Sequence, residues 1–273
     1  MHKKYKAHVI SLNYRLRYIK VMIAHKNTSE SNKRAFSMLD IISPKSLRWI
    51  ALTIAFSHGT GCTAENLASN PSFAQGLKID QLTPFNTLIE EVVFEGRQTV
   101  RVQEPIELLK TNEDNLAILS GIDFHNGEIE IWLAGTRNTE AAESARGFTG
   151  IAFRIADDPT EYEAIYVRPT NGRADDQQRR NHSIQYISHP EYTWNKLRSD
   201  TPSKYEAYAD MEPGKWIKYR LVVEGERAEL YLNDADQPNL IVKDLKLGDK
   251  SGRIGLWIDS GTTAYFSDIK VSD

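Results

Sequence analysis

The sequence reads WIKYRLVV at residues 216–223, AELYLN at 228–233, GRIGLW at 252–257 and AYFSDIKV at 264–271. Apolar and polar residues alternate in these segments, and a period of two is typical of a β-strand with one buried face. Glycine, aspartate, asparagine and proline residues separate the segments, as they commonly separate strands. The C-terminal part of the chain is therefore predicted to consist of consecutive strands.

The same pattern recurs upstream, from about residue 86 onward. Apolar segments flank Glu95-Gly96 and Asn126-Gly127, and Asn-Gly between alternating segments is a strong signal for a β-hairpin. Pro105–Leu109 is helix-like, and Thr139–Ala145 is expected to form a short helical turn. The upstream strands are predicted at residues 88–94, 99–102, 116–124, 128–132, 150–155, 163–168 and 182–187. This many short strands indicates a sandwich or a barrel.

The order of the four C-terminal segments resembles the C-terminal half of laminin-G and concanavalin A-like domains. In those domains a strand that begins with Trp is followed by a segment like ELYLN and then by segments like GRIGLW and FSDIKV. The resemblance implies an all-β fold, a concanavalin A-like jelly-roll β-sandwich of two antiparallel sheets. It implies no single activity, because the superfamily contains lectins, glycosidases and adhesion modules.

Two segments in the middle of the chain resemble one subfamily more specifically. They are YEAIYVRP at residues 162–169 and HSIQYISHPEYTW at residues 182–194. Both resemble the secreted bacterial 3-keto-disaccharide hydrolases, which are also described as glycoside-hydrolase-like domains. The resemblance covers roughly residues 86–273. It implies cleavage of glycosidic bonds in oxidised disaccharides or glycosides.

Charge is distributed unevenly along the 273 residues. Residues 1–62 carry 11 of the 34 basic residues and only two of the 37 acidic ones, Glu30 and Asp40. The remainder carries 23 basic and 35 acidic residues, a sum of −12. Because nucleic-acid binding needs a cationic surface, we expect no nucleic-acid partner for this acidic domain.

The one cysteine, Cys62, follows a segment that is typical of an export signal. Lys45 and Arg48 flank the start of the apolar run Trp49–Phe56, and small residues lead from this run to Cys62. The run is shorter than the roughly 20 residues that a spanning helix needs. The pattern predicts a lipoprotein-like signal with lipidation of Cys62, and a buried strand with an inert core cysteine is the alternative. With such a signal the protein would be extracytoplasmic, in the periplasm or at the cell surface, and would contact a membrane only through its lipid anchor.

These features predict four regions. A basic extension occupies residues 1–37 and need not be translated, because Met38 could start the chain. The export signal occupies residues 38–62, a polar linker residues 63–77, and the jelly-roll domain residues 78–273.

Glu128 and Glu130 lie two residues apart on a predicted strand, so their carboxylates share one face. A retaining glycosidase needs two carboxyl groups about 5 Å apart. Laminarinase-type members of the superfamily use such a strand with a further acid on the same face, but Trp132 follows here and no later acid joins the pair. The glycosidase pattern is incomplete, and an exposed acidic strand face is the alternative.

The predicted strand around Tyr166 offers a better candidate site. Ile165 and Val167 are expected to enter the core, which leaves Tyr166 and Arg168 together on the other face. A tyrosine ring can stack on a pyranose, and a guanidinium can bind hydroxyls or a carboxylate. Arg154 would join them if its strand is a neighbour in the sheet. The alternative is an Arg–Tyr cluster that only packs the sheet.

The polar and aromatic segment Asn171–Trp194 is expected to form a binding loop, because long irregular stretches in compact domains often bind ligands. The side chains in it that suit carbohydrate contact are Asn171, Arg179, His182, Gln185, Tyr192 and Trp194. His182 and His189 could also act as bases or metal ligands, although each could equally be structural.

No metal ligands are assigned from the sequence, and the cofactor stays undetermined. A divalent cation, either calcium or a catalytic metal, is one option. The aspartate pairs Asp157-Asp158 and Asp175-Asp176 are oxygen-rich and could bind calcium. Solvated loop charge is the alternative.

Two functions of different classes follow, and in both the partner is a carbohydrate. In an enzyme, a ketone at C3 of the sugar would acidify the C2–H bond. A base would remove that proton, for which Glu163, His182 and Tyr166 are the candidates, while Arg154 or Arg168 would stabilise the enolate. In a non-catalytic carbohydrate-binding module, the same face would only bind. A surface adhesion domain with a protein partner is a third option.

Overall fold

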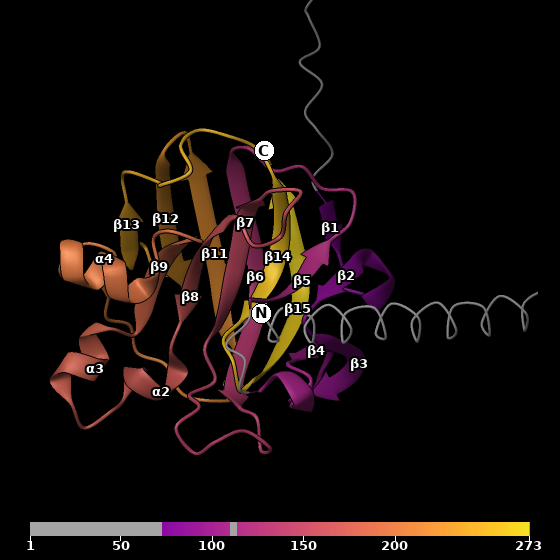
Figure 1. Cartoon of the computed structure of the whole chain (residues 1–273). Coiled ribbons are helices and arrows are strands. Elements are labelled where there is room, and N and C mark those ends of the chain that lie inside the picture. Colours follow the sequence, from indigo (N-terminus) through magenta and orange to yellow (C-terminus); the bar gives the residue numbers. More distant parts are fainter. Residues whose placement is uncertain (1–72, 110–113, 273) are drawn as a thin grey trace, which may run out of the picture. The chain divides into compact units, whose positions relative to one another are not determined.

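The computed structural model describes residues 73–109 and 114–272 (Figure 1). The predicted basic extension, the export signal with Cys62 and most of the predicted linker lie outside the described residues.

One sheet contains eight strands within the described residues. Its order is β13-β12-β11-β6-β15-β4-β3, and β1 pairs with the last residues of β15. The bounds are β1 Phe73–Gln75, β3 Leu88–Phe94, β4 Arg97–Gln103, β6 Gly127–Arg137, β11 Ile217–Glu224, β12 Arg227–Leu232, β13 Leu240–Val242 and β15 Thr262–Ser272. The start of the sandwich was predicted at residue 78. Because β1 already belongs to this sheet, the sandwich begins upstream of that residue.

The second sheet contains seven strands in the described part of the chain, in the order β10-β9-β8-β7-β14-β5-β2. The bounds are β2 Leu82–Phe85, β5 Asn115–Leu119, β7 Thr149–Ile155, β8 Tyr162–Val167, β9 Ile184–His189, β10 Glu206–Ala207 and β14 Arg253–Ile258. The paired strands of both sheets are antiparallel.

The two sheets pack around one apolar core. Ile129 and Ile131 of β6 face it from the first sheet, and Phe153 of β7 and Ile165 of β8 face it from the second. All four side chains are fully buried, and each contributes about 1.5–3 kcal/mol relative to an exposed position. The expectation of an all-β sandwich with two antiparallel sheets is confirmed, and every strand predicted from alternation overlaps an observed strand.

The two predicted hairpins have different outcomes. β3 and β4 form the expected hairpin, in which Glu95 and Gly96 both have positive φ, 46° and 78°, as a tight two-residue turn requires. The prediction of a hairpin at Asn126-Gly127 is wrong, because β5 and β6 belong to different sheets. Asn126 instead accepts a hydrogen bond from the backbone N–H of Gly225, 2.9 Å away, in the turn between β11 and β12.

The helices are short and were largely missed by the sequence analysis. The α-helices are α2 Pro169–Gly172, α3 Gln177–Asn181 and α4 Trp194–Asp200, and the 3-10 helices are η1 Ile79–Gln81 and η2 Ile106–Leu108. Figure 1 shows α2, α3 and α4 gathered beside β8 and β9. Only η2 was expected, and Thr139–Ala145 forms turns in place of a helix. None of the helices in the described ranges has the length and apolar character that a membrane crossing requires.

Candidate functional site

Tyr166 and Arg168 lie together on the outer face of the second sheet, as expected. The Tyr166 ring stacks on Trp257 with a centroid distance of 4.4 Å, and its hydroxyl accepts a hydrogen bond from Arg168 at 2.8 Å. Gly150 of β7 pairs with Tyr166, and a Cβ at Gly150 would lie only 2.7 Å from the Tyr166 Cβ. The Arg168 guanidinium also lies 5.2 Å from the ring centre of Phe148, so cation–π attraction helps to hold it.

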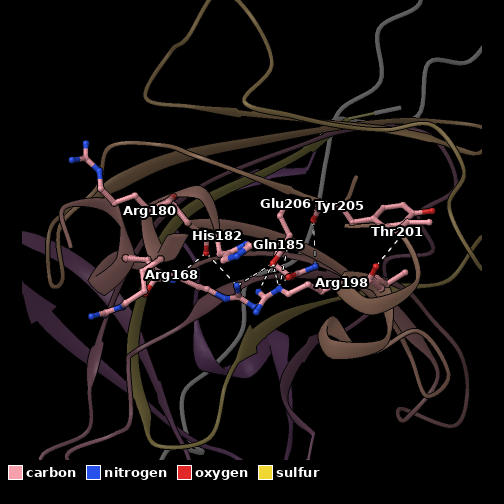
Figure 2. A network of polar contacts seen from close by, with 12 residues as sticks. Arg168, Arg180, His182, Gln185, Arg198, Thr201, Tyr205 and Glu206 are labelled. Atoms are coloured by element: carbon pink, nitrogen blue, oxygen red, sulfur yellow. Dashed lines mark hydrogen bonds and ion pairs between the residues drawn. The ribbon is translucent and has the colours of Figure 1, made fainter. Parts of the chain in front are cut away.

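A buried carboxylate, Glu206, lies beside this pair and contacts two guanidinium groups and an imidazole. Figure 2 shows Arg168, His182 and Arg198 pointing toward Gln185 and Glu206. Arg198 Nε donates to Glu206 Oε1 at 3.0 Å and its Nη2 binds the same oxygen, while Arg168 Nη1 lies 3.5 Å from it. His182 Nδ1 lies 2.9 Å from the other carboxylate oxygen. The Glu206 side chain is only 2% exposed, so its charge is balanced by these groups and not by water.

These groups border a pocket of about 520 Å³. It lies among β8, α2, α3, α4 and the loops that precede β7 and follow β14. The predicted site residues that line it are Tyr166, Arg168, Asn171, Arg179, His182 and Trp194. Lining residues that the sequence analysis missed include Arg146, Phe148, Arg198 and Asp259. The structure therefore brings most of the predicted binding segment to one place and adds a carboxyl group to it.

Gln185 and Tyr192 do not line this pocket. Gln185 is fully buried behind Arg168, from which its Oε1 accepts a hydrogen bond at 3.3 Å, so it positions the guanidinium and does not present itself to a ligand. Tyr192 packs against the core, and the ammonium groups of Lys196 and Lys246 lie over its ring.

The structure does not place Arg154 beside Tyr166, so that expectation is wrong. A β-bulge in β7, where Arg154 has a φ of 53° and the register against β14 shifts, sends Ile155 to the outer face instead. The buried Arg154 guanidinium donates to the backbone oxygen of Gly225 at 2.6 Å and to that of Gly248. It therefore reaches the turn between β11 and β12 of the other sheet.

Glu163 lies beside Arg154 and also away from the pocket. Its Oε2 is 3.5 Å from Arg154 Nη1, and its Oε1 accepts hydrogen bonds from the Tyr186 hydroxyl at 2.7 Å and the Leu247 N–H at 3.0 Å. Burial raises the pKa of the Glu163 carboxyl, and these hydrogen bonds and Arg154 oppose the shift. Because Glu163 is fully buried, we assign it a structural role and withdraw it from the candidate bases.

Two proton acceptors do line the pocket. Burial raises the pKa of Asp259 to about 6, with a backbone hydrogen bond from Ser260 opposing the shift. Burial also lowers the pKa of His182, and Arg198 and Arg168 act in the same direction, while Glu206 opposes it. Both groups are therefore mostly unprotonated at neutral pH. Burial raises the pKa of Tyr166 to about 12, so its hydroxyl keeps its proton at neutral pH. Tyr166 can therefore act as a hydrogen-bond donor to a substrate but not as the base.

The remaining candidates lie elsewhere. Glu128 and Glu130 project from the outer face of the first sheet, where Arg220 lies 3.1 Å from Glu128 and Lys218 lies 3.4 Å from Glu130, so they form ion pairs and no catalytic dyad. His189 Nδ1 lies 2.7 Å from Asp114, away from the pocket.

One aspartate of each pair, Asp157-Asp158 and Asp175-Asp176, has a local partner. Asp158 accepts hydrogen bonds from Thr160, and Asp176 caps α3 by accepting from the Arg179 N–H. Among the residues described, no three His, Cys, Asp or Glu side chains converge as a metal-binding group.

The fold and the family match together define a carbohydrate-related domain of the concanavalin A-like class. More specifically, the chain belongs to the family described as the 3-keto-alpha-glucoside-1,2-lyase-like domain, whose sequence model matches residues 128–272. The family expected from the sequence is thereby confirmed. No curated protein matches the chain significantly.

Several solved structures are similar to this chain at low sequence identity. Carbohydrate-binding module CBM66 from Bacillus subtilis is 15% identical with a TM-score of 0.48, and the match covers 70% of this chain and 96% of that one. A putative glycosyl hydrolase from Parabacteroides distasonis is 13% identical with a TM-score of 0.47, and covers 75% and 100%. The Emp47p carbohydrate recognition domain is 13% identical with a TM-score of 0.41, and covers 78% and 99%.

Replacing Arg154 should destabilise the fold in a pH-dependent way. Arg154→Met leaves the buried Glu163 carboxylate without its cation, which is expected to cost about 3–5 kcal/mol. Glu163 already has a raised pKa, and losing Arg154 raises it further. Protonation relieves the unpaired charge, so the loss should be smaller near about pH 5 than near about pH 8. Denaturant unfolding at both pH values measures this.

Arg173→Met, which removes an exposed ion pair, is the control, and an equal loss in both variants would contradict the assignment.

Removing the Glu206 charge should lower the pKa of His182. Glu206 is the group that opposes the downward shift, so Glu206→Gln leaves burial and two guanidinium groups to act alone. Titration of the histidine ring signals by NMR measures this pKa directly. Arg173→Gln, which removes an exposed charge outside the pocket, is the control variant and should leave the His182 titration unchanged. An unchanged His182 titration would show that the contact with Glu206 does not form in solution.

Proposed function

We propose that the domain cleaves 3-keto-glycosides by elimination across the C1–C2 bond, with the chemistry in the pocket beside Tyr166. Family membership supplies the substrate class. The observation that carries the proposal is Asp259, a partly buried carboxyl group with a pKa of about 6 that lines the same pocket as Arg168 and Tyr166. A general base is most effective when its pKa lies near the working pH.

The reaction needs one base and donors for a developing oxyanion. The ketone at C3 acidifies the C2–H bond, and ionised Asp259 takes that proton. The electron pair moves onto C2 and the C3 oxygen, where the Arg168 guanidinium and the Tyr166 hydroxyl would stabilise the negative charge. The enolate then collapses to form the C1–C2 double bond and breaks the bond between C1 and the glycosidic oxygen. Protonated Asp259 returns its proton to the leaving oxygen, so the products are an enone and a free sugar.

A sugar also needs an apolar surface to lie against. Trp194 at the start of α4 is 46% exposed and lines the pocket. The Arg168 guanidinium lies 5.9 Å from the ring centre of Trp194 and 5.2 Å from that of Phe148, which also lines the pocket. Aromatic rings stack on the C–H faces of pyranoses. This exposed ring equally supports the second candidate, a carbohydrate-binding module without catalysis. That candidate requires saturable binding of a glycan that stays intact on incubation.

Replacing Asp259 separates the two candidates. Wild-type protein is expected to release a monosaccharide from a 3-keto disaccharide and none from the unoxidised parent, with kcat/KM rising as the pH passes about 6. Asp259→Asn should lower kcat about 100- to 10,000-fold with little change in the dissociation constant. Product release is followed by NMR, and Arg173→Gln is the matched control on an exposed ion pair. Full activity of Asp259→Asn, or equal cleavage of the parent sugar, would overturn the mechanism.

We also propose that the protein is exported and lipidated at Cys62, on the basis of the sequence pattern at residues 38–62. Cys62→Ser should move the protein from the membrane fraction to the soluble fraction of a host with a lipoprotein pathway. Incorporation of a labelled fatty acid into wild type, and none into the variant, is the direct measurement. Equal labelling of both proteins would refute the proposal.

A further inference from the structure

The pocket is cationic, although the domain around it is acidic. Four guanidinium groups line it, from Arg146, Arg168, Arg179 and Arg198. The carboxyl groups around them are Asp259 in the pocket wall, Glu206 behind it, and the buried Glu104, which accepts hydrogen bonds from Ser260 and Gly261 of the wall. An excess of one positive charge remains when all three are ionised. The chain after residue 62 sums to −12, so this excess is a local feature and not a reflection of composition.

The charges in the pocket are not all neutralised by the protein. Glu206 already binds Arg198 and contacts Arg168 and His182. Within the described part of the chain, Arg146 and Arg179 form no ion pair with a carboxylate. The Arg179 guanidinium donates, within the described residues, only to the backbone oxygen of Thr170, at 3.2 Å, and to Asn171 Oδ1, at 3.4 Å.

Arg168 also holds a donor that the described residues leave unused. Its side chain is 6% exposed, and its Nε has no hydrogen-bond acceptor among the residues described. The Nε of Arg179 is in the same situation. A buried donor without an acceptor is unfavourable, so a ligand that supplies the acceptor stabilises the complex. Guanidinium groups prefer planar or tetrahedral oxyanions, which they bind through two parallel hydrogen bonds.

We infer that the sugar bound in this pocket carries an anionic group, a carboxylate, sulfate or phosphate, which Arg146, Arg168 and Arg179 bind while Trp194 stacks on the ring. The inference rests on the proposed function, in that it names the class of sugar for the same pocket. It goes beyond it because elimination at a 3-keto group requires no charge on the substrate. The acidic sugar is a uronic acid or a sugar ester of sulfate or phosphate, and these three sources differ in charge and shape.

Calorimetric binding to the full chain tests the charge requirement. The probes are methyl glucuronide, glucose 6-sulfate and glucose 6-phosphate, with methyl glucoside as the neutral match. The acidic probes should bind at least about tenfold more tightly than methyl glucoside, as expected for charge-assisted hydrogen bonds. Raising the salt from about 20 mM to about 300 mM should weaken the acidic probes and leave the neutral one unchanged. The order of the three acidic probes identifies the source of the anion.

Two variants locate the binding in the pocket. Arg179→Gln and Arg146→Gln should each remove about tenfold of the affinity for the tightest acidic probe and leave the affinity for methyl glucoside unchanged. Arg173→Gln is the matched control, because Arg173 lies outside the pocket and is paired with Asp210 and Glu212. Thermal unfolding verifies that each variant is folded.

Equal affinity for acidic and neutral probes at low salt, or a preference that survives both variants, would overturn the inference. These measurements need no cleavage, so the inference of an anionic ligand and the proposed lyase function can each be refuted without the other. Efficient cleavage of a neutral 3-keto disaccharide without acid preference would refute only the anionic ligand. Acid preference without any cleavage of 3-keto sugars would refute only the lyase mechanism.

Discussion

Strand β8 is buried on both faces, and its alternation determines where the groups of the pocket lie. Ile165 and Val167 enter the core, while Tyr166 and Arg168 face outward. A shift of the register by one residue would exchange the two sets and place an arginine in the core. The Tyr219 hydroxyl of the opposite sheet donates to the backbone oxygen of Ile165 at 2.9 Å, and this bond opposes such a shift.

The same alternation explains how much could be predicted from the sequence. A period of two depends only on local side-chain direction, so the strands and the shared face of Tyr166 and Arg168 could be recognised without any knowledge of pairing. Trp194 and His182 could be placed near that face because they belong to the segment that follows the strand. The start of the sandwich was placed too late, because the short strand β1 is held by pairing with β15 and shows little pattern of its own.

What could not be predicted depends on long-range pairing. The bulge at Arg154 follows from how β7 meets β14, about a hundred residues later, and alternation within β7 gives no sign of it. Asp259 reaches the pocket because its backbone N–H donates to the oxygen of Phe148 at 3.1 Å, which joins the end of β14 to the start of β7. Arg198 lies in α4 and Glu206 in β10, and in the sequence they look like ordinary surface charges. The burial of Glu206 against the half-buried Arg198 is a tertiary effect.

The pocket combines two properties that usually oppose each other, a cationic lining and an acid with a raised pKa. Cations attract anions, but they also lower the pKa of nearby acids and favour the ionised state. At Asp259 burial outweighs the arginines, so the carboxyl keeps a pKa of about 6 in a cationic pocket. Glu206 contributes to this, because it binds Arg198 and contacts Arg168 from behind and so neutralises part of their charge. The buried carboxylate thus sets both the position of the guanidinium groups and the strength with which they act on the proton acceptor in front of them.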